Sequence, residues 1–522
     1  MIDLEKRKNK ASYNNPVFKL SAIVIALFTI WGALSPNNLA KNASAIFNFT
    51  SYSFGWFYLG SVACFVAFCL FLAFSKYGKT RLGKDDEKPE FSLFTWISML
   101  FSAGFGVGIV FWGVAEPLTH FANPPYADVE PQSVESARLA MRYSFFNWGI
   151  HQWSVFTIVG LALAYFQFRK KSKSLISETL EGIHIKRGKE SIKKSVNILA
   201  VISTVIGVST SLGMGILQIN GGLNYVFSVP NNAWMQISIV LVLLALYLAS
   251  ATTGLHKGIK ILSNTNMILV MILMAFFLFR GPTVFILDSF VLGIGDYLQN
   301  FTEMSFYLTP YSGDSWVNDW TVFYWAWVIA WSPFVGSFVA RISKGRTIRE
   351  FVMGVLIVPP VIAFMWMAIF GGTGLYMDLF QNTAIADAVS RDVTTAIFIL
   401  LKEFPLYFFF SIIIMALIMI FLVTSADSAV FVLGMMTSDG SLNPTNTVKI
   451  IWGVLIAGIT IVLIISSGLT GLQAASLVSA LPFTVILILI SISLYRSLVK
   501  ETKSIQTRID DSELQELERK AQ

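Results

Sequence analysis

The chain has few charged residues, few histidines and only two cysteines. Charged residues make up 13% of its 522 residues, whereas soluble globular domains typically have about 25%, so an ordinary soluble protein is disfavoured. Cys64 and Cys69 lie in one apolar run, at a spacing that puts them on different sides of a helix. They are therefore expected to be small apolar fillers and not part of a disulfide framework. The four histidines form no metal-like cluster in the sequence.

Hydrophobic residues, in contrast, make up 55% of the chain. A helix that spans a membrane needs about 20 mainly apolar residues. About twelve such stretches are present; they lie near residues 18–37, 53–75, 92–115, 141–167, 195–226, 233–252, 259–280, 319–341, 350–372, 400–436, 447–467 and 474–496. The sequence therefore predicts an all-α integral membrane protein. The basic residues before the first stretch are interpreted as a cytoplasmic anchor and not as part of a signal peptide.

Basic residues are concentrated in alternate loops, which predicts the orientation of the chain. The basic segments are 76–88, 169–194, 256–260, 341–349 and the tail from Arg496. The loops poor in Lys and Arg are 36–52, 116–140, 281–318 and 373–396. The positive-inside rule then places both termini in the cytoplasm.

Two segments are expected to be helical without spanning a membrane. Residues 281–308 are mildly apolar and include Asp288 and Asp296, which predicts an amphipathic helix at the outer interface. The tail 496–522 mixes both signs of charge and is expected to form a solvated cytoplasmic helix.

A glycine-rich stretch interrupts the third apolar run. The segment 102–108 reads SAGFGVG, and glycine at three alternate positions weakens a helix and bares its backbone. Within a membrane, freed backbone groups are tolerated where they line a cavity or meet protein, and their carbonyl oxygens can bind a cation. Close helix packing through small residues explains the glycines equally well.

A second segment, residues 148–156, carries aromatic side chains deep within an apolar run. At about 100° per residue, Trp148 and Phe156 are about 80° apart on a helix, and Trp153 is about 140° from Trp148. The three side chains can line one broad face. Packing in the protein core is the plainer explanation for this segment taken alone.

The densest aromatic signal lies in residues 320–338. Trp320, Tyr324, Trp327, Trp331, Phe334 and Phe338 are spaced by three or four residues and form one stripe on a helix. Aromatic faces attract a desolvated cation by about 2 kcal/mol or more, and a trimethylammonium group suits such a surface. A carboxylate on the same solute would accept a hydrogen bond from an indole N–H. Core packing is again the structural alternative.

The segment 421–428 offers oxygen ligands inside an apolar run. The adjacent hydroxyls of Thr424 and Ser425, together with backbone carbonyls, make a plausible sodium site; alternatively, each hydroxyl bonds to the preceding helical turn. Asp427 is an intramembrane acid, which by default suggests a function. A structural partner such as Arg341 is an equally good explanation.

At these residues the sequence resembles the betaine/carnitine/choline transporter (BCCT) family, and most of all the glycine betaine importers of Gram-positive bacteria. The strongest match is DWTVFYWAWVIAWSPFVGSFVARISKGRTIRE, at 319–350. Supporting stretches are SAGFGVGIVFWGVAEP (102–117), NWGIHQW (147–153), GLNYVF (222–227), LSNTNM (262–267) and TSADSAVFVLGMMTS (424–438).

The resemblance implies a LeuT-type fold of two inverted repeats, formed by the third to seventh and the eighth to twelfth spans. It divides the chain into a cytoplasmic N-terminal segment, two peripheral helices, a first repeat with the amphipathic helix, a second repeat and a cytoplasmic tail. Their bounds are 1–17, 18–90, 91–318, 319–498 and 499–522. Members usually form homotrimers in the cell membrane.

The resemblance also implies the site residues. The solute would lie in an aromatic box, against a broken helix, among Trp148, Trp153, Phe156, Gly104, Phe105, Gly106, Trp327, Trp331 and Phe334. One sodium ion would bind to carbonyls of Ser102, Phe105 and Phe421 and to the hydroxyls of Thr424 and Ser425. A second would involve Thr204 and Phe334. Asp427 and Arg341 are candidates for a gating or structural role, and no organic cofactor is expected.

Several residues depart from the pattern of the family's betaine carriers. Those carriers commonly have Met at Phe105, Tyr at Phe156 and a second consecutive Trp at Val328, and the loss of that Trp is expected to open one wall of the box. Val208 replaces a hydroxyl at the second sodium site, which is expected to weaken it. These changes leave the substrate open between glycine betaine and choline, carnitine, taurine, ectoine or a sulfonium analogue.

The leading functional hypothesis is sodium-driven uptake of a compatible solute. A solute exchanger without ion coupling is a second hypothesis, which the intact Thr424–Ser425 pair disfavours. A channel should show a pore-lining ring, and an enzyme should show a nucleophile with a base or a metal cluster. The sequence shows none of these features.

Overall fold

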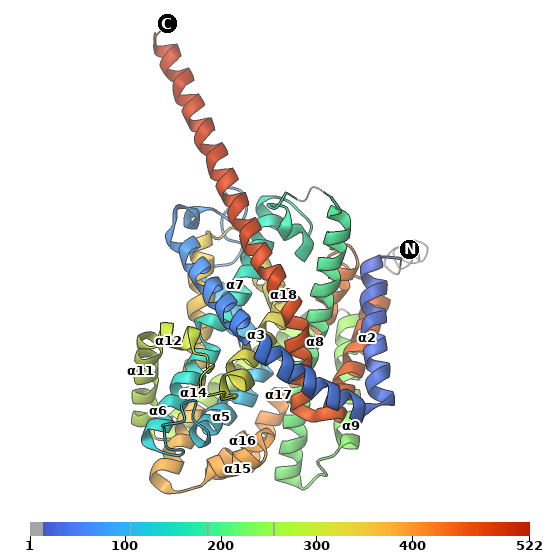
Figure 1. Ribbon diagram of the computed structural model, residues 1–522, viewed down its shortest axis with the longest axis vertical. Helices are drawn as coiled ribbons and strands as arrows, with labels where there is room; N and C mark the ends of the chain where they lie inside the picture. The colour runs from blue at the N-terminus through green and yellow to red at the C-terminus, as the bar shows by residue number, and fades with distance from the viewer. Residues whose placement is uncertain (1–13, 105, 185–186, 254–255, 522) are drawn as a thin grey trace.

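The computed structural model describes residues 14–521 apart from 105, 185–186 and 254–255. Within this part the chain is a bundle of helices (Figure 1), and its β pairing is limited to an isolated bridge between Arg81 and Thr347. The helices are α2 (Pro16–Leu34), α3 (Pro36–Phe74), α4 (Leu93–Gly104), α5 (Val107–Ala122), α6 (Val134–Trp148), α7 (Ile150–Ala164), α8 (Lys189–Phe227), α9 (Ala233–Thr253), α10 (His256–Arg280), α11 (Thr283–Gln299), α12 (Phe301–Phe306), α13 (Phe323–Ile342), α14 (Ile348–Gln381), α15 (Ile385–Arg391), α16 (Ala396–Lys402), α17 (Tyr407–Thr437) and α18 (Asn446–Ala521).

Nine helices in the described residues are long and apolar enough to cross a membrane, and a helix pair bent by 110° adds a tenth. The sequence predicted about twelve spans. The predicted spans 447–467 and 474–496 are both parts of α18, whose backbone leaves the helical region at Gly468 (φ 58°, ψ −133°). The predicted span 92–115 is divided between the short helices α4 and α5. The difference therefore lies in how broken helices are counted.

Burial separates central helices from peripheral ones. In the segment Val134–Arg169, 94% of the most apolar 18-residue stretch is buried inside the protein. The buried share of the corresponding stretch is 78% both in α8 and in Asn318–Ile342. For α2 and α9 the value is 28%. Exposed apolar side chains such as Leu27 (61%) and Leu241 (54%) cover these two helices. An apolar surface of this kind suits contact with lipid, so α2 and α9 lie at the periphery of the bundle.

The basic loops lie together at one end of the bundle. Arg81 donates to the carbonyl of Gly345 at 2.9 Å, and Arg169 donates to that of Gly83 at 2.9 Å. Arg169 also pairs with Glu501 of α18. In Figure 1, α18 leaves the bundle at this end, where α2 begins.

The loops poor in basic residues meet one another elsewhere. Gln132 donates to Asp387 at 2.7 Å, and the indole of Trp316 donates to the carbonyl of Asn123 at 3.1 Å. Loops 76–88, 169–194 and 341–349 thus form one group in space, and loops 116–140, 281–318 and 373–396 form another.

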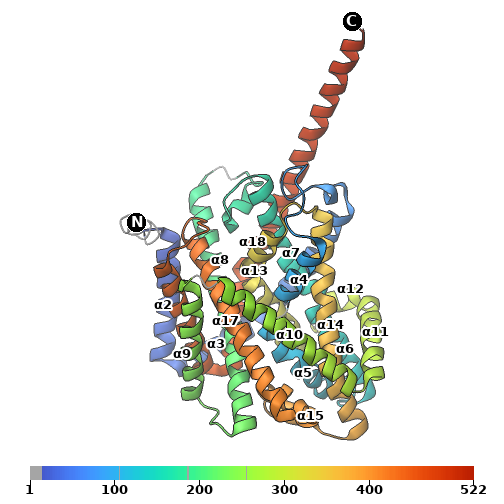
Figure 2. The same ribbon diagram turned by 180° about the vertical axis from the view of Figure 1, so that it is seen from behind.

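The segment after α10 forms two helices, α11 and α12. α11 is bent away from α10 by 110° and packs beside α6 and α14. Figure 2 shows α10 crossing the back of the bundle obliquely toward α11. Val284 and Val291 of α11 are exposed (73% and 68%), whereas Ile286 and Asp296 are buried, so α11 is amphipathic. The tail is helical to Ala521, as the prediction of a terminal helix requires.

Candidate functional site

The glycine stretch forms a break between two helices. α4 ends at Gly104, and α5 begins at Val107 after Gly106, whose backbone is extended (φ −144°, ψ −177°). The discontinuity predicted from the glycines is therefore present. Phe105 lies outside the described residues, as do the side chains of residues 101–104. The predicted ligand roles of Ser102, Gly104 and Phe105 consequently stay predictions.

Gly108 is the last glycine of the stretch, and the neighbouring side chains leave no room for a Cβ atom at this position. A Cβ atom on Gly108 would lie 2.4 Å from Cη2 of Trp327 and 3.2 Å from Cη2 of Trp148. Real Cβ atoms do not approach so closely. The absence of a side chain at Gly108 thus lets two tryptophans from different helices reach the start of α5.

A second break, at Gly149, positions the next wall of the site. α6 ends at Trp148 and α7 begins at Ile150, with Gly149 outside the helical region (φ −88°, ψ −153°). A Cβ atom on Gly149 would lie 2.6 Å from the carbonyl oxygen of Phe145. The rings of Trp153 and Phe156 on α7 meet edge to face, with centroids 5.2 Å apart.

The third wall is the aromatic stripe, which is continuous from Trp320 to Phe334, whereas the predicted last member, Phe338, is 38% exposed. Neighbouring rings from Trp320 to Phe334 have centroids 5.9–6.4 Å apart, in the order Trp320, Tyr324, Trp327, Trp331 and Phe334. Trp320 lies in a π-helical turn at Asn318–Val322 that precedes α13. Trp327 and Trp331 are close to parallel (14°).

Five aromatic residues from α6, α7 and α13 surround one cavity, and we call them the aromatic box: Trp148, Trp153, Phe156, Trp327 and Trp331. Gly106 and Gly108 of α5 also line this cavity, as do Val208 of α8 and Ser425 of α17. These five residues, which come from segments far apart in the chain, belong to the set that the resemblance implies; their role in binding a solute stays a prediction. The cavity volume is about 20 Å³, which is room for about one water molecule. A solute requires these rings to move apart.

The polar edges of the box are held by Glu116 of α5, which the sequence reasoning missed. Its carboxylate is fully buried and accepts hydrogen bonds from the indole N–H of Trp148 (2.8 Å), from Asn147 (2.8 Å) and from the hydroxyl of Tyr324. His120 lies 3.3 Å away. The signal was available, because an acid inside an apolar run is a functional candidate by default. The indole N–H of Trp148 is therefore bonded to the protein and not free for a solute.

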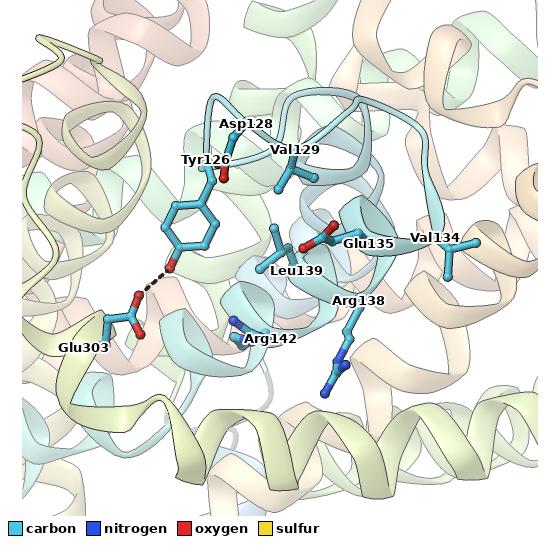
Figure 3. Close-up of a pocket in the computed structure, with 9 residues that line it drawn as sticks. All are labelled: Tyr126, Asp128, Val129, Val134, Glu135, Arg138, Leu139, Arg142 and Glu303. Carbon is cyan, nitrogen blue, oxygen red and sulfur yellow. Dashed lines mark hydrogen bonds between the residues drawn. The ribbon is translucent and has the colours of Figure 1, made fainter.

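A polar cavity of about 610 Å³ lies among the loops poor in basic residues (Figure 3). It is lined by Tyr126, Asp128, Val129, Val134, Glu135, Arg138, Leu139, Arg142 and Glu303. Figure 3 shows the hydroxyl of Tyr126 pointing at Glu303, to which it donates at 3.3 Å. Arg138 makes an ion pair with Asp296 of α11 at 2.6 Å. Both signs of charge line this cavity, in contrast to the aromatic box.

Packed rings connect the polar cavity to Glu116. The hydroxyls of Tyr126 and Tyr143 lie 3.1 Å apart, and the ring centroid of Tyr143 lies 4.8 Å from that of Trp316. The ring of Trp316 lies 4.8 Å from that of His120, which in turn contacts Glu116. These rings fill the space between the polar cavity and Glu116.

The predicted sodium ligands on α17 differ in their availability. Ser425 lines the cavity, and its hydroxyl makes no hydrogen bond within the described part of the chain. Thr424 donates to the carbonyls of Ile420 (2.9 Å) and Phe421 (3.2 Å), which is the back-bonding alternative. A hydroxyl that donates in this way keeps its lone pairs, so it can still bind a cation.

The second predicted sodium site has one hydroxyl. Thr204 of α8 donates to the carbonyl of Ala200 at 2.7 Å, and Val208 lies in the wall of the cavity. Phe334 packs on Trp331 and does not line the cavity.

Asp427 and Arg341, the candidate gating pair, are not joined by an ion pair in the described residues. Asp427 accepts a hydrogen bond from the hydroxyl of Ser250 on α9, at 3.4 Å. Arg341 is exposed. The suggestion that Arg341 partners Asp427 is therefore wrong, because the two groups face different surroundings.

Val328, the position at which the family's betaine carriers have a tryptophan, is buried (1% exposed) but does not line the cavity. The expected opening of one wall of the box is thus not seen at this position. Cys64 and Cys69 are free thiols, as predicted.

Many apolar helices enclose a closed aromatic cavity beside a broken helix, which defines a polytopic membrane protein with a buried binding site. The chain belongs to the BCCT (betaine/carnitine/choline) family of transporters. The model of this family matches residues 16–503 of the chain. The protein is consequently a transporter and not an enzyme.

Three relatives illustrate the range of the family. The chain is 55% identical to an ectoine/hydroxyectoine transporter of Virgibacillus pantothenticus, over 95% of this chain and 99% of the relative. It is 49% identical to the glycine betaine transporter OpuD of Bacillus subtilis, over 94% and 95% of the two chains. It is 36% identical to the high-affinity choline transport protein of Escherichia coli, over 96% and 74%.

Proposed function

We propose that this protein takes up a zwitterionic compatible solute in symport with sodium, across a bacterial cell membrane. The observation that carries the proposal is the aromatic box beside the break between α4 and α5. Glycine betaine is the lead candidate from the sequence, and ectoine joins it because the relative from Virgibacillus pantothenticus carries that name.

The box suits the cationic end of such a solute. Five rings in a site closed from water attract a desolvated cation, each well-placed ring contributing about 2 kcal/mol or more. The backbone amides that start α5, at Val107 and Gly108, follow the extended residue Gly106. The amino end of a broken helix favours the carboxylate of the solute.

Sodium coupling is proposed from α17. Ser425 faces the same cavity as the box, and Thr424 and the carbonyl of Phe421 lie in the adjacent helical turn. Hard oxygen atoms of hydroxyls and carbonyls suit an alkali cation. A cation beside the cavity would favour solute binding through the shared wall, which gives coupling between the two binding events.

The larger architecture is also proposed from the resemblance. It comprises two inverted repeats of LeuT type, a homotrimer, and both termini in the cytoplasm. Both the beginning of α2 and the exit of α18 lie at the end of the bundle where the basic loops meet, which supports the last point.

The test is uptake of radiolabelled glycine betaine and ectoine into proteoliposomes with an inward sodium gradient. We expect accumulation of at least one solute with sodium, and none with potassium alone. Failure to take up either solute, or equal uptake in potassium, would contradict the proposal.

Ser425→Ala tests the assigned ion site. We expect the sodium concentration for half-maximal uptake to rise about tenfold, since one hydrogen-bonding or ligand group is worth about 1–1.5 kcal/mol. Ser411→Ala is the matched control, because Ser411 is a buried serine on the same helix that does not line the cavity. An unchanged sodium dependence in Ser425→Ala would remove Ser425 from the site.

Solute exchange without ion coupling is the second candidate. Counterflow of labelled solute at equal rates in sodium and potassium would favour exchange over symport.

A further inference from the structure

The aromatic box contains an amide that the protein leaves unused. Gln152 lies on α7 next to Trp153, one helical turn before Phe156, and its side chain lines the cavity. It is 3% exposed, and its Oε1 atom is buried without a hydrogen-bond partner in the described part of the chain. An amide carbonyl that is buried and unpaired destabilises the protein. A group in this position is expected to find its partner in the bound solute.

Two indole N–H groups of the box already have partners in the protein. The indole N–H of Trp148 donates to Glu116, and the indole N–H of Trp327 donates to the hydroxyl of Ser211 at 3.3 Å. Gln152 therefore differs from these two groups, because it is a cavity-lining residue whose buried amide oxygen has no partner in the described part of the chain.

An unpaired acceptor among aromatic rings distinguishes between two kinds of cation. A trimethylammonium group has no N–H and cannot donate to Gln152, so its binding leaves the carbonyl buried and unpaired. A cyclic amidinium has N–H groups on its charged ring and can donate. Its planar cation also stacks on indole faces, as a guanidinium does. Sites built to hydrogen-bond a donor discriminate strongly against analogues that lack it.

We propose that Gln152 determines specificity, and that its carbonyl accepts a hydrogen bond from an N–H on the cationic group of the solute. The site then prefers cyclic amidinium carboxylates to fully N-methylated ammonium carboxylates. This inference rests on the proposed function, because it assumes that the solute binds in the aromatic box.

The test compares equilibrium binding of ectoine and glycine betaine to the purified full-length protein and to Gln152→Met and Gln152→Leu. Ectoine is the cyclic amidine probe, and glycine betaine is the N-methylated probe. Both substitutions introduce an apolar side chain whose length or volume is similar to that of glutamine, and both remove the amide acceptor. We expect the ratio of the two dissociation constants to shift against ectoine by about tenfold or more in both variants.

Gln218→Met is the matched control. Gln218 is also a buried glutamine (1% exposed) with an unpartnered Oε1, but it lies on α8 outside the cavity wall. Its Nε2 donates to the carbonyl of Val110 at 3.2 Å. We expect this variant to leave the ratio of the two dissociation constants unchanged.

The outcomes separate the two proposals. If the unaltered protein binds neither solute, the proposed function fails. If it binds them and Gln152→Met weakens both equally, the amide acts on the shared carboxylate or on packing, and the proposal for Gln152 is overturned. The proposal for Gln152 is also overturned if neither affinity changes. Retained binding of glycine betaine shows that the variant is folded.

Discussion

Glu116 is the residue on which the polar contacts of the box converge. It is a carboxylate without exposed surface, and donors from α6 and from α13 end on it. A charged acceptor forms stronger hydrogen bonds than a neutral one. Glu116 therefore fixes the orientation of the Trp148 ring, which is one wall of the site.

Glu116→Gln is expected to weaken solute binding about tenfold, since the amide turns one acceptor into a donor and leaves a buried N–H without a partner. The measurement is the dissociation constant of the purified variant for the transported solute. Glu135→Gln serves as the control, because Glu135 is exposed at the polar cavity. Equal affinity of Glu116→Gln and the unaltered protein would show that the network does not position the box.

Gly108 tests whether the close approach of two tryptophans to the broken helix matters. In Gly108→Ala, the new Cβ would lie 2.4 Å from Trp327, so the ring or α5 must move. Overpacking of this kind costs about 1–3 kcal/mol, and we expect initial uptake to fall by about tenfold or more at equal protein abundance. The control is Gly60→Ala on α3, whose added Cβ meets nothing within 4 Å. Normal uptake by Gly108→Ala would mean that the box is looser than described.

At the scale of single residues, the sequence predicted which aromatic side chains share a helical face, but it did not predict the polar residues that contact them. The spacing of Trp327 and Trp331 determines that they share a helical face, so their stripe could be read from the chain alone. Glu116 and Gln152 gain their importance from contacts with residues distant in the sequence, and hydrophobic periodicity carries no information about such contacts. The ion partner suggested for Asp427 was wrong for the same reason.

At the scale of elements, the loop after α3 is fastened to the loop between α13 and α14. The N–H of Leu82 donates to the carbonyl of Arg346, and the N–H of Gly345 donates to that of Leu82, both at 2.8 Å. Lys344 makes an ion pair with Glu87 at 2.8 Å. The hydrogen bond from Lys344, followed by one from the backbone N–H of Lys84, holds the pKa of Glu87 below its usual value.

A lowered carboxyl pKa means that the contact stabilises the folded loops above the ordinary glutamate pKa of about 4.3. This contribution is lost as the pH falls through the lowered folded value. We expect Glu87→Gln to speed amide hydrogen exchange in residues 80–90 at pH 7. The unaltered protein should match the variant only below about pH 4, after correction for intrinsic exchange rates.

Asp86→Asn is the control for this prediction, because Asp86 is exposed in the same loop. Equal exchange of Glu87→Gln and the unaltered protein at pH 7 would show that the backbone hydrogen bonds hold the loops without the ion pair. The pair is partly exposed, with Lys344 at 39%, so its effect should remain local and fall with salt.

Breaks in helices explain most of the differences between the predicted and observed elements. Gly104–Gly108 predicted an interruption that the structure contains. Gly149, in contrast, lies in a run that hydropathy treats as one span, and Gly468 marks a kink between two helical parts of α18. A glycine permits a break, but the packing of neighbouring helices decides whether the chain uses it.

At the scale of the whole molecule, hydropathy and loop charge together gave the class, the approximate spans and the separation of the two groups of loops. These properties depend on the composition of single segments, so they can be read without tertiary contacts. The ring packing between the polar cavity and Glu116 could not be predicted in this way. It arises where Tyr143 of α6 packs on Trp316, and Trp316 packs on His120 of α5.

The central claim is that the solute binds inside the aromatic box. Equilibrium binding of labelled glycine betaine and ectoine to purified Trp331→Leu tests it most directly. We expect the dissociation constant of the bound solute to rise about thirtyfold, because one ring contributes about 2 kcal/mol to a desolvated cation. Trp234→Leu, at a tryptophan that is 79% exposed, should bind as the unaltered protein does. Unchanged affinity in Trp331→Leu would contradict the account.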